Sequence, residues 1–200
     1  MCYDRAVRDR AAYILVGGKS SRFGSDKALI DINGGPLALH LADVVSEAAG
    51  SVTLVGPSAR YERLGLPIIP DTHQDAGPLA GILAALEHTS ASWNLILACD
   101  MPLLSAAFVE FLFTQAEMGG HQVLMPVSPA GGDEPLCAVY GNVAATHIRR
   151  EIEKGTRKIT FALDSLAVRR ILPSEYAHID PAGKSFTNVN TIAQWEQSQQ

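Results

Sequence analysis

The sequence predicts an α/β protein built on a mostly parallel sheet with helices on both faces. Short apolar segments rich in β-forming residues alternate along the chain with longer segments of helical period. The chain has 200 residues, of which 47% are hydrophobic and 18% charged. This length and composition allow one substantial core and suit one domain better than two.

Each strand is expected where an apolar, β-rich run is bounded by turn-forming residues, and each helix where apolar residues recur with helical period. The expected strands are Ala12–Val16, Val52–Val55, Pro67–Ile69, Leu95–Cys99, Gln122–Pro126 and Leu136–Tyr140. The expected helices are Leu37–Ala49, Leu79–Thr89, Ala106–Met118, Val143–Lys154 and Ile192–Gln197. Pro36 and Pro78 at helix starts, and Gly50 and Gly155 just beyond helix ends, support these boundaries.

No internal repeat or long low-complexity linker divides the chain, so one domain over residues 11–200 is expected. Residues 1–10 are expected to form a flexible N-terminal leader. The longest apolar runs, such as Trp93–Cys99, are too short to cross a bilayer, and five of the first ten residues are charged. We therefore expect a cytoplasmic protein that does not bind membranes.

Cysteine, histidine and charge content exclude several classes of function. The three cysteines, Cys2, Cys99 and Cys137, are odd in number and widely spaced, which argues against a disulfide framework or a cysteine metal site. The six histidines form no HExxH-like pair, so any metal is expected to have oxygen ligands. The net charge of −5 argues against nucleic-acid binding.

The glycine-rich segment from Leu15 to Lys27 carries the strongest functional signal. It follows the first expected strand, and glycines there can bring backbone N–H groups against an anion; these are Gly17, Gly18 and Gly24. Three cations suited to phosphate oxygens accompany them: Lys19, Arg22 and Lys27. Two residues separate the last glycine from the lysine, so this is not a Walker A loop. We expect a nucleotide polyphosphate here, with an ordinary strand-to-helix turn as the alternative.

Two carboxylates follow expected strands, at the edge of the sheet where ligands collect. Asp100 ends an apolar strand and has no hydrogen-bonding neighbour in its own segment, so we expect it to bind Mg²⁺. The alternative is that it caps the helix that begins near Ser105. Asp71 either shapes a turn or accepts hydrogen bonds from a base or ribose.

Polar residues nearer the C-terminus are further candidates for ligand contacts. Arg157 and Lys158 suit a second anion, or else form a solvated helix end. Asn188 and Asn190 alternate along an extended segment and so point the same way, although a turn explains them equally well.

The order of five motifs resembles the molybdenum cofactor guanylyltransferase family, a MobA-like group of nucleotidylyltransferases. The motifs are the glycine-rich loop, an Asp before Gly77-Pro78-Leu79-Ala80-Gly81, Cys99-Asp100-Met101-Pro102, Pro135-Leu136-Cys137-Ala138 and Asn188-Val189-Asn190-Thr191. The resemblance covers the chain from about Leu15 to Thr191. It implies a single-domain, Rossmann-like three-layer sandwich of the nucleotidyltransferase type. It also implies Mg²⁺-dependent transfer of GMP from GTP to the phosphate of molybdopterin, with release of pyrophosphate.

The resemblance also implies roles for individual residues. The nucleotide would contact Leu15, Gly17, Gly18, Lys27, Asp71 and Asp100. Catalysis would use Arg22 and Lys27 on the phosphates and Asp100 as the Mg²⁺ ligand. The pterin side would be lined by Arg157, Lys158, Asn188 and Asn190. Three positions depart from the family pattern: Val16 replaces the usual alanine, Gly56 stands where an asparagine often contacts the nucleotide, and Glu134 precedes Pro135 where histidine is frequent.

The implied reaction is an in-line attack by the pterin phosphate on the α-phosphorus of GTP, which needs no protein nucleophile. A cytidylyltransferase that uses CTP, or a sugar-phosphate nucleotidylyltransferase, is the alternative on the same fold. The paired glycines Gly17-Gly18 favour the guanylyl branch. A nucleotide-binding regulator without turnover is disfavoured by the presence of Lys27 and Asp100. The expected partners are GTP, molybdopterin, and cofactor-delivery proteins or recipient molybdoenzymes.

Overall fold

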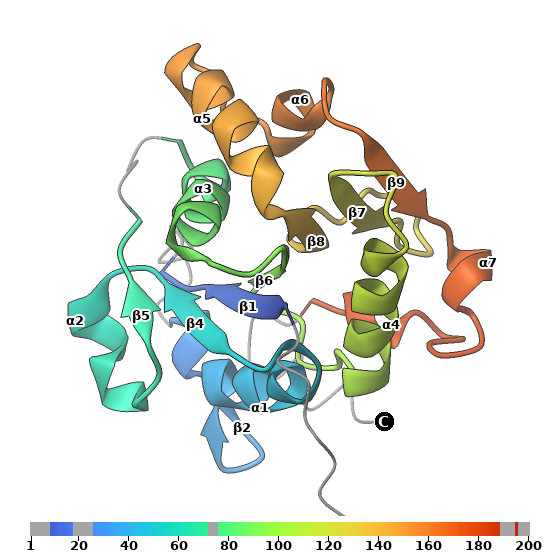
Figure 1. Ribbon diagram of the computed structural model, residues 1–200. Coiled ribbons are helices and arrows are strands. Elements are labelled where there is room, and N and C mark those ends of the chain that lie inside the picture. Colours follow the sequence, from blue (N-terminus) through green and yellow to red (C-terminus); the bar gives the residue numbers. More distant parts are fainter. Residues whose placement is uncertain (1–8, 18–25, 72–75, 189–194, 196–200) are drawn as a thin grey trace, which may run out of the picture.

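The computed structural model describes residues 9–17, 26–71, 76–188 and 195, and it has the expected α/β architecture (Figure 1). A seven-stranded sheet runs in the order β5-β4-β1-β6-β8-β7-β9. The strands are β1 (Arg10–Leu15), β4 (Val52–Val55), β5 (Ile68–Ile69), β6 (Trp93–Ala98), β7 (Val123–Pro126), β8 (Cys137–Gly141) and β9 (Val168–Ile171). A separate two-stranded hairpin consists of β2 (Asp31–Ile32) and β3 (Gly35–Pro36).

Helices cover both faces of the sheet, which makes three layers. The α-helices are α1 (Leu37–Ala49), α2 (Ser58–Tyr61), α3 (Pro78–His88), α4 (Ala106–Glu117), α5 (Ala145–Glu153), α6 (Ile159–Leu163) and α7 (Pro173–Tyr176). Short 3₁₀ helices are η2 (Lys27–Leu29), η3 (Glu62–Leu64), η4 (Asn142–Ala144) and η5 (Lys184–Phe186). In Figure 1, α3 and α5 lie above the sheet and α1 lies below it.

Strand alternation divides the core between the two faces. In β6, Leu95 and Leu97 pack with α1 and α4, whereas Ile96 packs with α3 and α5. Successive side chains of a strand point to opposite faces, so an apolar run such as this one is buried on both sides. The long apolar strands predicted from the sequence therefore lie at the centre of the sheet.

The sheet is mostly parallel, as expected, with one reversed strand. The pairs β1–β4, β1–β6, β4–β5 and β7–β9 are parallel, whereas β8 runs antiparallel to both β6 and β7. Only a short connection, residues 127–136, joins β7 to β8. A connection of this length can reverse the chain but cannot carry the crossover that a parallel pair needs.

Several elements differ from expectation. The hairpin β2–β3, the edge strand β9 and the helices α2, α6 and α7 were not predicted, and the helix expected over Val143–Lys154 divides into η4 and α5. The expected helix Ile192–Gln197 lies outside the described residues except for Trp195, which is buried in the core. Within the described part of the chain, no helix is both long and apolar enough to span a membrane. Cys99 and Cys137 are buried free thiols, and Cys2 is outside the described residues.

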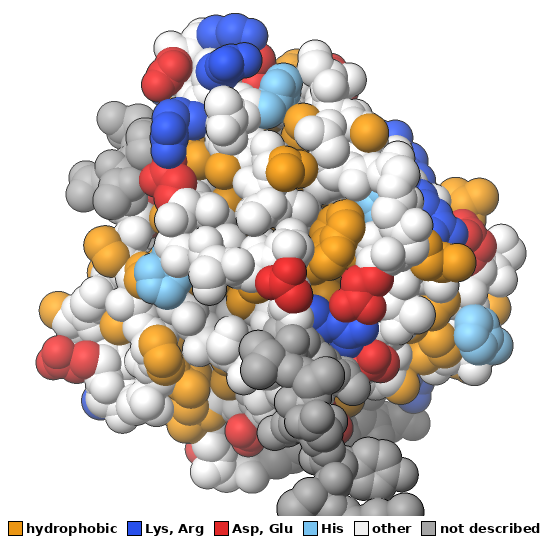
Figure 2. Space-filling model, viewed as in Figure 1, with side chains coloured by type: hydrophobic (Ala, Val, Ile, Leu, Met, Phe, Trp, Pro, Cys, Tyr) orange, Lys and Arg blue, Asp and Glu red, His pale blue; other side chains and the backbone are white. Residues whose placement is uncertain are grey.

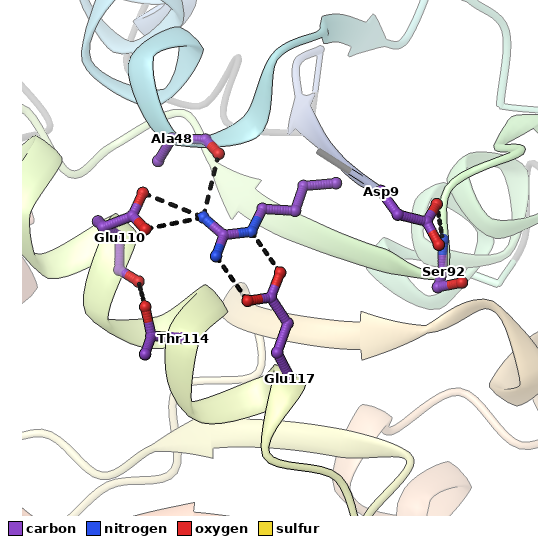
Figure 3. A network of polar contacts seen from close by, with 7 residues as sticks. Asp9, Ala48, Ser92, Glu110, Thr114 and Glu117 are labelled. Carbon is purple, nitrogen blue, oxygen red and sulfur yellow. Dashed lines mark hydrogen bonds and ion pairs between the residues drawn. The ribbon is translucent and has the colours of Figure 1, made fainter. Parts of the chain in front are cut away.

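The first strand begins at Arg10, inside the segment expected to be a leader, whose first eight residues lie outside the described part of the chain. Arg10 is 8% exposed and binds the carboxylate of Glu117 through Nε and a terminal nitrogen, at 2.6 and 2.7 Å (Figure 3). Its other terminal nitrogen lies 3.0 Å from both oxygens of Glu110. Arg10 thus ties β1 to α4.

In the face drawn in Figure 2, acidic and basic side chains lie side by side near the middle of the view.

Candidate active site

A cavity of about 530 Å³ opens at the carboxyl ends of β4, β1 and β6. Its base consists of residues at these strand ends, including Leu15, Val55 and Ala98. The start of α3 contributes Gly77 and Pro78 to its wall. Because these three strands are parallel neighbours, their carboxyl ends meet at one edge, the usual position of ligands in open α/β sheets.

Five of the residues expected to bind nucleotide line this one cavity: Leu15, Gly17, Lys27, Asp71 and Asp100. Gly18, Arg22 and Asn190 lie outside the described residues. The order of the strands therefore brings together residues in η2 and at or just beyond the ends of β1, β5 and β6, which are far apart in the sequence.

Lys27 and Asp100 form an ion pair in the lining of the cavity. Lys27 Nζ lies 3.5 Å from Asp100 Oδ2, and the two side chains are 22% and 23% exposed. This distance is long for an ion pair between charged groups, which normally approach to about 2.7–2.9 Å. Both groups remain available to a ligand that separates them. Asp100 does not cap α4, because the hydroxyl of Ser105 accepts the Phe108 N–H at 3.2 Å and fills that position.

The described lining of the cavity is acidic. Its charged residues are Asp26, Lys27, Asp71 and Asp100, three carboxylates against one cation. A bare triphosphate would be repelled by this set, so a polyphosphate needs further positive charge to bind here. Among the described residues, no group of three or more His, Cys, Asp or Glu side chains is arranged to hold a metal. Asp100 fits an ion that completes its shell with water and phosphate oxygens, as Mg²⁺ does.

Cys99 also lines the cavity but is not suited to covalent catalysis. Burial, aided by the negative charge of Asp100, raises the pKa of the Cys99 thiol. The reactive form of cysteine is the thiolate, so this thiol is held in its unreactive, protonated form. Cys99 is therefore a packing residue of the cavity wall.

Asp26 lines the cavity and is held by Tyr61 behind it, and the sequence analysis singled out neither residue. The Tyr61 hydroxyl donates to Asp26 Oδ2 at 2.6 Å, and Arg60 approaches the same oxygen at 3.4 Å. Asp26 Oδ1 accepts the N–H of Ala28 at 3.2 Å and so caps η2, the turn that carries Lys27. Burial and the hydrogen bond to Asp26 raise the pKa of Tyr61, so its hydroxyl stays a donor.

Close backbone contacts explain two glycines of the cavity. Gly17 has φ of +84°, and a Cβ there would lie 2.6 Å from Pro57 Cδ. At Gly56, a Cβ would collide with the carbonyl oxygen of Val16 and would lie 2.9 Å from Val16 Cγ2. Val16 and Gly56 are thus in direct contact, and the backbone of Val16 by itself leaves no room for a side chain at position 56.

Glu134 lies close to Asp100 although it is distant in sequence. Leu97 of β6 stands opposite Cys137 of β8, and the Ala98 N–H donates to Leu136 O at 2.7 Å. The residues that leave β6 therefore meet those that enter β8. Burial, with a contribution from the charge of Asp100, raises the pKa of Glu134. Glu134 does not itself line the cavity; Leu136, two residues further along the chain, does.

The three described residues expected on the pterin side, Arg157, Lys158 and Asn188, are exposed and do not line the cavity. Arg157 donates to the carbonyls of Ile152 and Thr156 at 3.3 and 3.1 Å. Lys158 Nζ lies 4.6 Å from the centre of the Phe161 ring. Their assignment to a second substrate stays a prediction.

Residues 12–167 match the family described as the MobA-like NTP transferase domain. A molybdenum cofactor guanylyltransferase of Ralstonia nicotianae is 33% identical over 201 aligned positions, covering 94% of this chain and 95% of that protein. One from Serratia proteamaculans is 33% identical and covers 92% of each chain. The crystal structure of molybdopterin-guanine dinucleotide biosynthesis protein A from Archaeoglobus fulgidus superposes with a TM-score of 0.80 at 29% identity, covering 94% of this chain and 96% of that one.

Proposed function

The chain belongs to the MobA-like NTP transferase family, and from this premise we propose that it transfers GMP from GTP to the phosphate of molybdopterin. The product is the guanine dinucleotide form of the molybdenum cofactor, and pyrophosphate is released. Relatives named molybdenum cofactor guanylyltransferase, which match over more than nine-tenths of both chains, support this reaction.

One observation carries the proposal: Lys27 and Asp100 meet in a cavity at the carboxyl ends of three adjacent parallel strands. A cation and a carboxylate opposite each other are what a nucleotide phosphate and its metal ion require. The sequence also carries the cations Lys19 and Arg22 in the glycine-rich segment that precedes Lys27.

We assign Mg²⁺ as the divalent ion of this site and Asp100 as its protein ligand. The lone carboxylate fits Mg²⁺, which commonly takes one or two carboxylates and completes its shell with phosphate oxygens and water. When bound, the ion neutralises charge on the phosphates. It therefore offsets the excess of carboxylates along the cavity wall.

The protein side of the mechanism is positioning and charge stabilisation. An oxygen of the acceptor phosphate forms a bond to the α-phosphorus of GTP, and the bond from that phosphorus to the β-phosphate oxygen breaks. The acceptor phosphate is an anion at neutral pH, so no side chain has to remove a proton. In this proposal Lys27 and Arg22 hold the phosphates and stabilise the charge that moves to pyrophosphate. Leu15, Gly17, Gly18 and Asp71 bind the nucleoside end.

The acceptor enters from the opposite side of the cavity in this proposal. Leu136 lines that side, and Glu134 lies next to it along the chain. We propose that the pterin extends beyond the cavity lining and contacts Arg157, Lys158, Asn188 and Asn190. The finished cofactor would pass in the cytoplasm to delivery proteins or to recipient molybdoenzymes.

Comparing GTP with CTP on the same molybdopterin acceptor tests the proposal. A pocket that satisfies the polar edge of guanine is left with unpaired groups when cytosine binds, which costs about 1–3 kcal/mol for each group. We therefore expect kcat/KM for GTP to exceed that for CTP by about tenfold or more. The measurement is release of pyrophosphate together with formation of the dinucleotide product.

Two further arms of the experiment separate the alternatives. A preference for CTP would replace the guanylyl assignment by a cytidylyl one. Turnover with sugar phosphates, but not with molybdopterin, would reject the acceptor. Binding of GTP without turnover on any acceptor would leave a nucleotide-binding regulator and would overturn the enzymatic proposal.

A further inference from the structure

The segment from Pro57 to Tyr61 contacts both described residues that flank positions 18–25. Pro57 packs against Gly17, where even a Cβ would come within 2.6 Å of Pro57 Cδ. Tyr61 donates its hydroxyl hydrogen to Asp26 Oδ2 at 2.6 Å. Gly17 and Asp26 are therefore both held against the stretch formed by Pro57 and α2.

Tyr61 is a rigid support for this contact. The Tyr61 side chain is fully buried in the core that also includes side chains of α1 and α4. A buried aromatic ring packed on several sides has one orientation, so its hydroxyl has a fixed direction. Arg60, in contrast, approaches the same oxygen of Asp26 at 3.4 Å with a side chain that is 55% exposed. Tyr61 therefore contributes the better ordered of the two contacts.

Asp26 relays this support to the lysine. Its Oδ2 accepts from Tyr61, while its Oδ1 accepts from the N–H of Ala28 at 3.2 Å. Lys27 lies between these residues, and its backbone begins the turn that Asp26 caps. From this backbone the Lys27 side chain reaches the cavity, where its Nζ lies 3.5 Å from Asp100. Rotation of the Asp26 carboxylate would release the turn and with it the position of Lys27.

We propose that Tyr61 is a positioning residue for the phosphate-binding lysine and acts on Lys27 through Asp26. The inference rests on the proposed function only in taking Lys27 as a phosphate ligand. Tyr61 itself does not touch the substrate. Its hydroxyl holds the capping carboxylate in the orientation that directs Lys27 toward Asp100.

A double-mutant cycle on binding of Mg²⁺ tripolyphosphate tests this inference. The probe carries the phosphates without a base or an acceptor, and calorimetry measures its Kd. The variants are Tyr61→Phe, Lys27→Ala and the combination of the two. Tyr176→Phe is the matched control, because Tyr176 is also buried and donates to a carbonyl at 2.7 Å, that of Val127, outside the cavity.

We expect Tyr61→Phe to weaken binding by up to about tenfold, because the hydrogen bond to a charged group sets the upper limit of what can be transmitted to Lys27. In the Lys27→Ala background the same change should alter the Kd by less than about twofold, because the group that it positions is gone. Tyr176→Phe should bind like the unmodified protein. A merely structural effect of Tyr61→Phe would instead persist when Lys27 is absent.

If the changes in Kd caused by Tyr61→Phe and by Lys27→Ala multiply in the double variant, the inference is overturned. It is also overturned if Tyr61→Phe binds tripolyphosphate as tightly as Tyr176→Phe does. If Tyr61→Phe does not fold, the cycle of Asp26→Asn with Lys27→Ala replaces it, and Asp71→Asn, which removes a charge from the same cavity, is the charge-matched control. Failure of the unmodified protein to bind tripolyphosphate would also reject the inference. A cycle that behaves as expected in a protein that transfers no GMP would reject the proposed function and leave the role of Tyr61 standing.

Discussion

Replacing Gly17 by alanine tests how closely the glycine-rich segment approaches α2. An L-residue held in the left-handed conformation, here with φ of +84°, costs about 1–2 kcal/mol. The new Cβ would lie 2.6 Å from Pro57 Cδ, well inside ordinary carbon–carbon contact. Overpacking of this kind costs about 1–3 kcal/mol. The free energy of unfolding should therefore fall by about 2–5 kcal/mol, the sum of the two.

Gly50→Ala is the matched control for the backbone part of this cost. Gly50 has φ of +77°, but a Cβ there has no heavy atom within 4 Å. Urea denaturation of both variants should show a larger loss of stability for Gly17→Ala, by about 1–3 kcal/mol. Pro57→Ala introduced into Gly17→Ala should recover this difference, since it removes the Cδ atom that the new methyl group meets.

The function of the two variants should differ as well. Gly17 lines the cavity and Gly50 does not, so Gly17→Ala should also weaken binding of GTP. Equal losses of stability in Gly17→Ala and Gly50→Ala, with no recovery by Pro57→Ala, would refute the close approach of Gly17 to Pro57.

Two other predictions concern the metal site and the fold. Asp100→Asn should keep the melting temperature of the protein but lose most Mg²⁺-dependent turnover, because the amide has no charge for the ion; a titration of activity with Mg²⁺ checks this, and unchanged activity at limiting Mg²⁺ would remove Asp100 as the ligand. Glu110→Gln combined with Glu117→Gln leaves the Arg10 guanidinium buried without a carboxylate and should cost about 3–5 kcal/mol. Arg10→Met should cost less, because the two carboxylates, 42% and 41% exposed, stay hydrated; the reverse order in urea denaturation would contradict this account.

The centre of the sheet could be predicted from the sequence, because a strand that is buried on both faces is an uninterrupted run of apolar residues. The segment Leu95–Cys99 is apolar throughout, and β6 lies between β1 and β8. The edge strand β9 has no such run, since it carries the partly exposed Arg169 and the exposed Arg170. The hairpin β2–β3 did have a signal: Asn33 and Gly34 both have positive φ, which the Asn-Gly pair favours in a two-residue turn.

The site was predictable to the extent that it follows from strand ends. Leu15 ends the first apolar strand, Asp71 and Asp100 follow two others, and parallel strands place such residues at one edge. Tyr61 had no local signal. Its partner Asp26 lies 35 positions earlier in the chain, and the two meet only in the folded protein. The reversed direction of β8 was not predictable either, because an apolar strand reads the same in both orientations.

The late arrival of β8 also matters for how the protein can be made. Strand β6 is apolar on both faces, and one of its two edges pairs with residues 137–141. While the ribosome is still synthesising the residues before position 137, that edge has unpaired N–H and C=O groups. An open, apolar edge of this kind readily recruits strands from other chains. Strand β8 therefore pairs with the open edge of β6 late in biosynthesis. A fragment that stops before β8 is expected to aggregate.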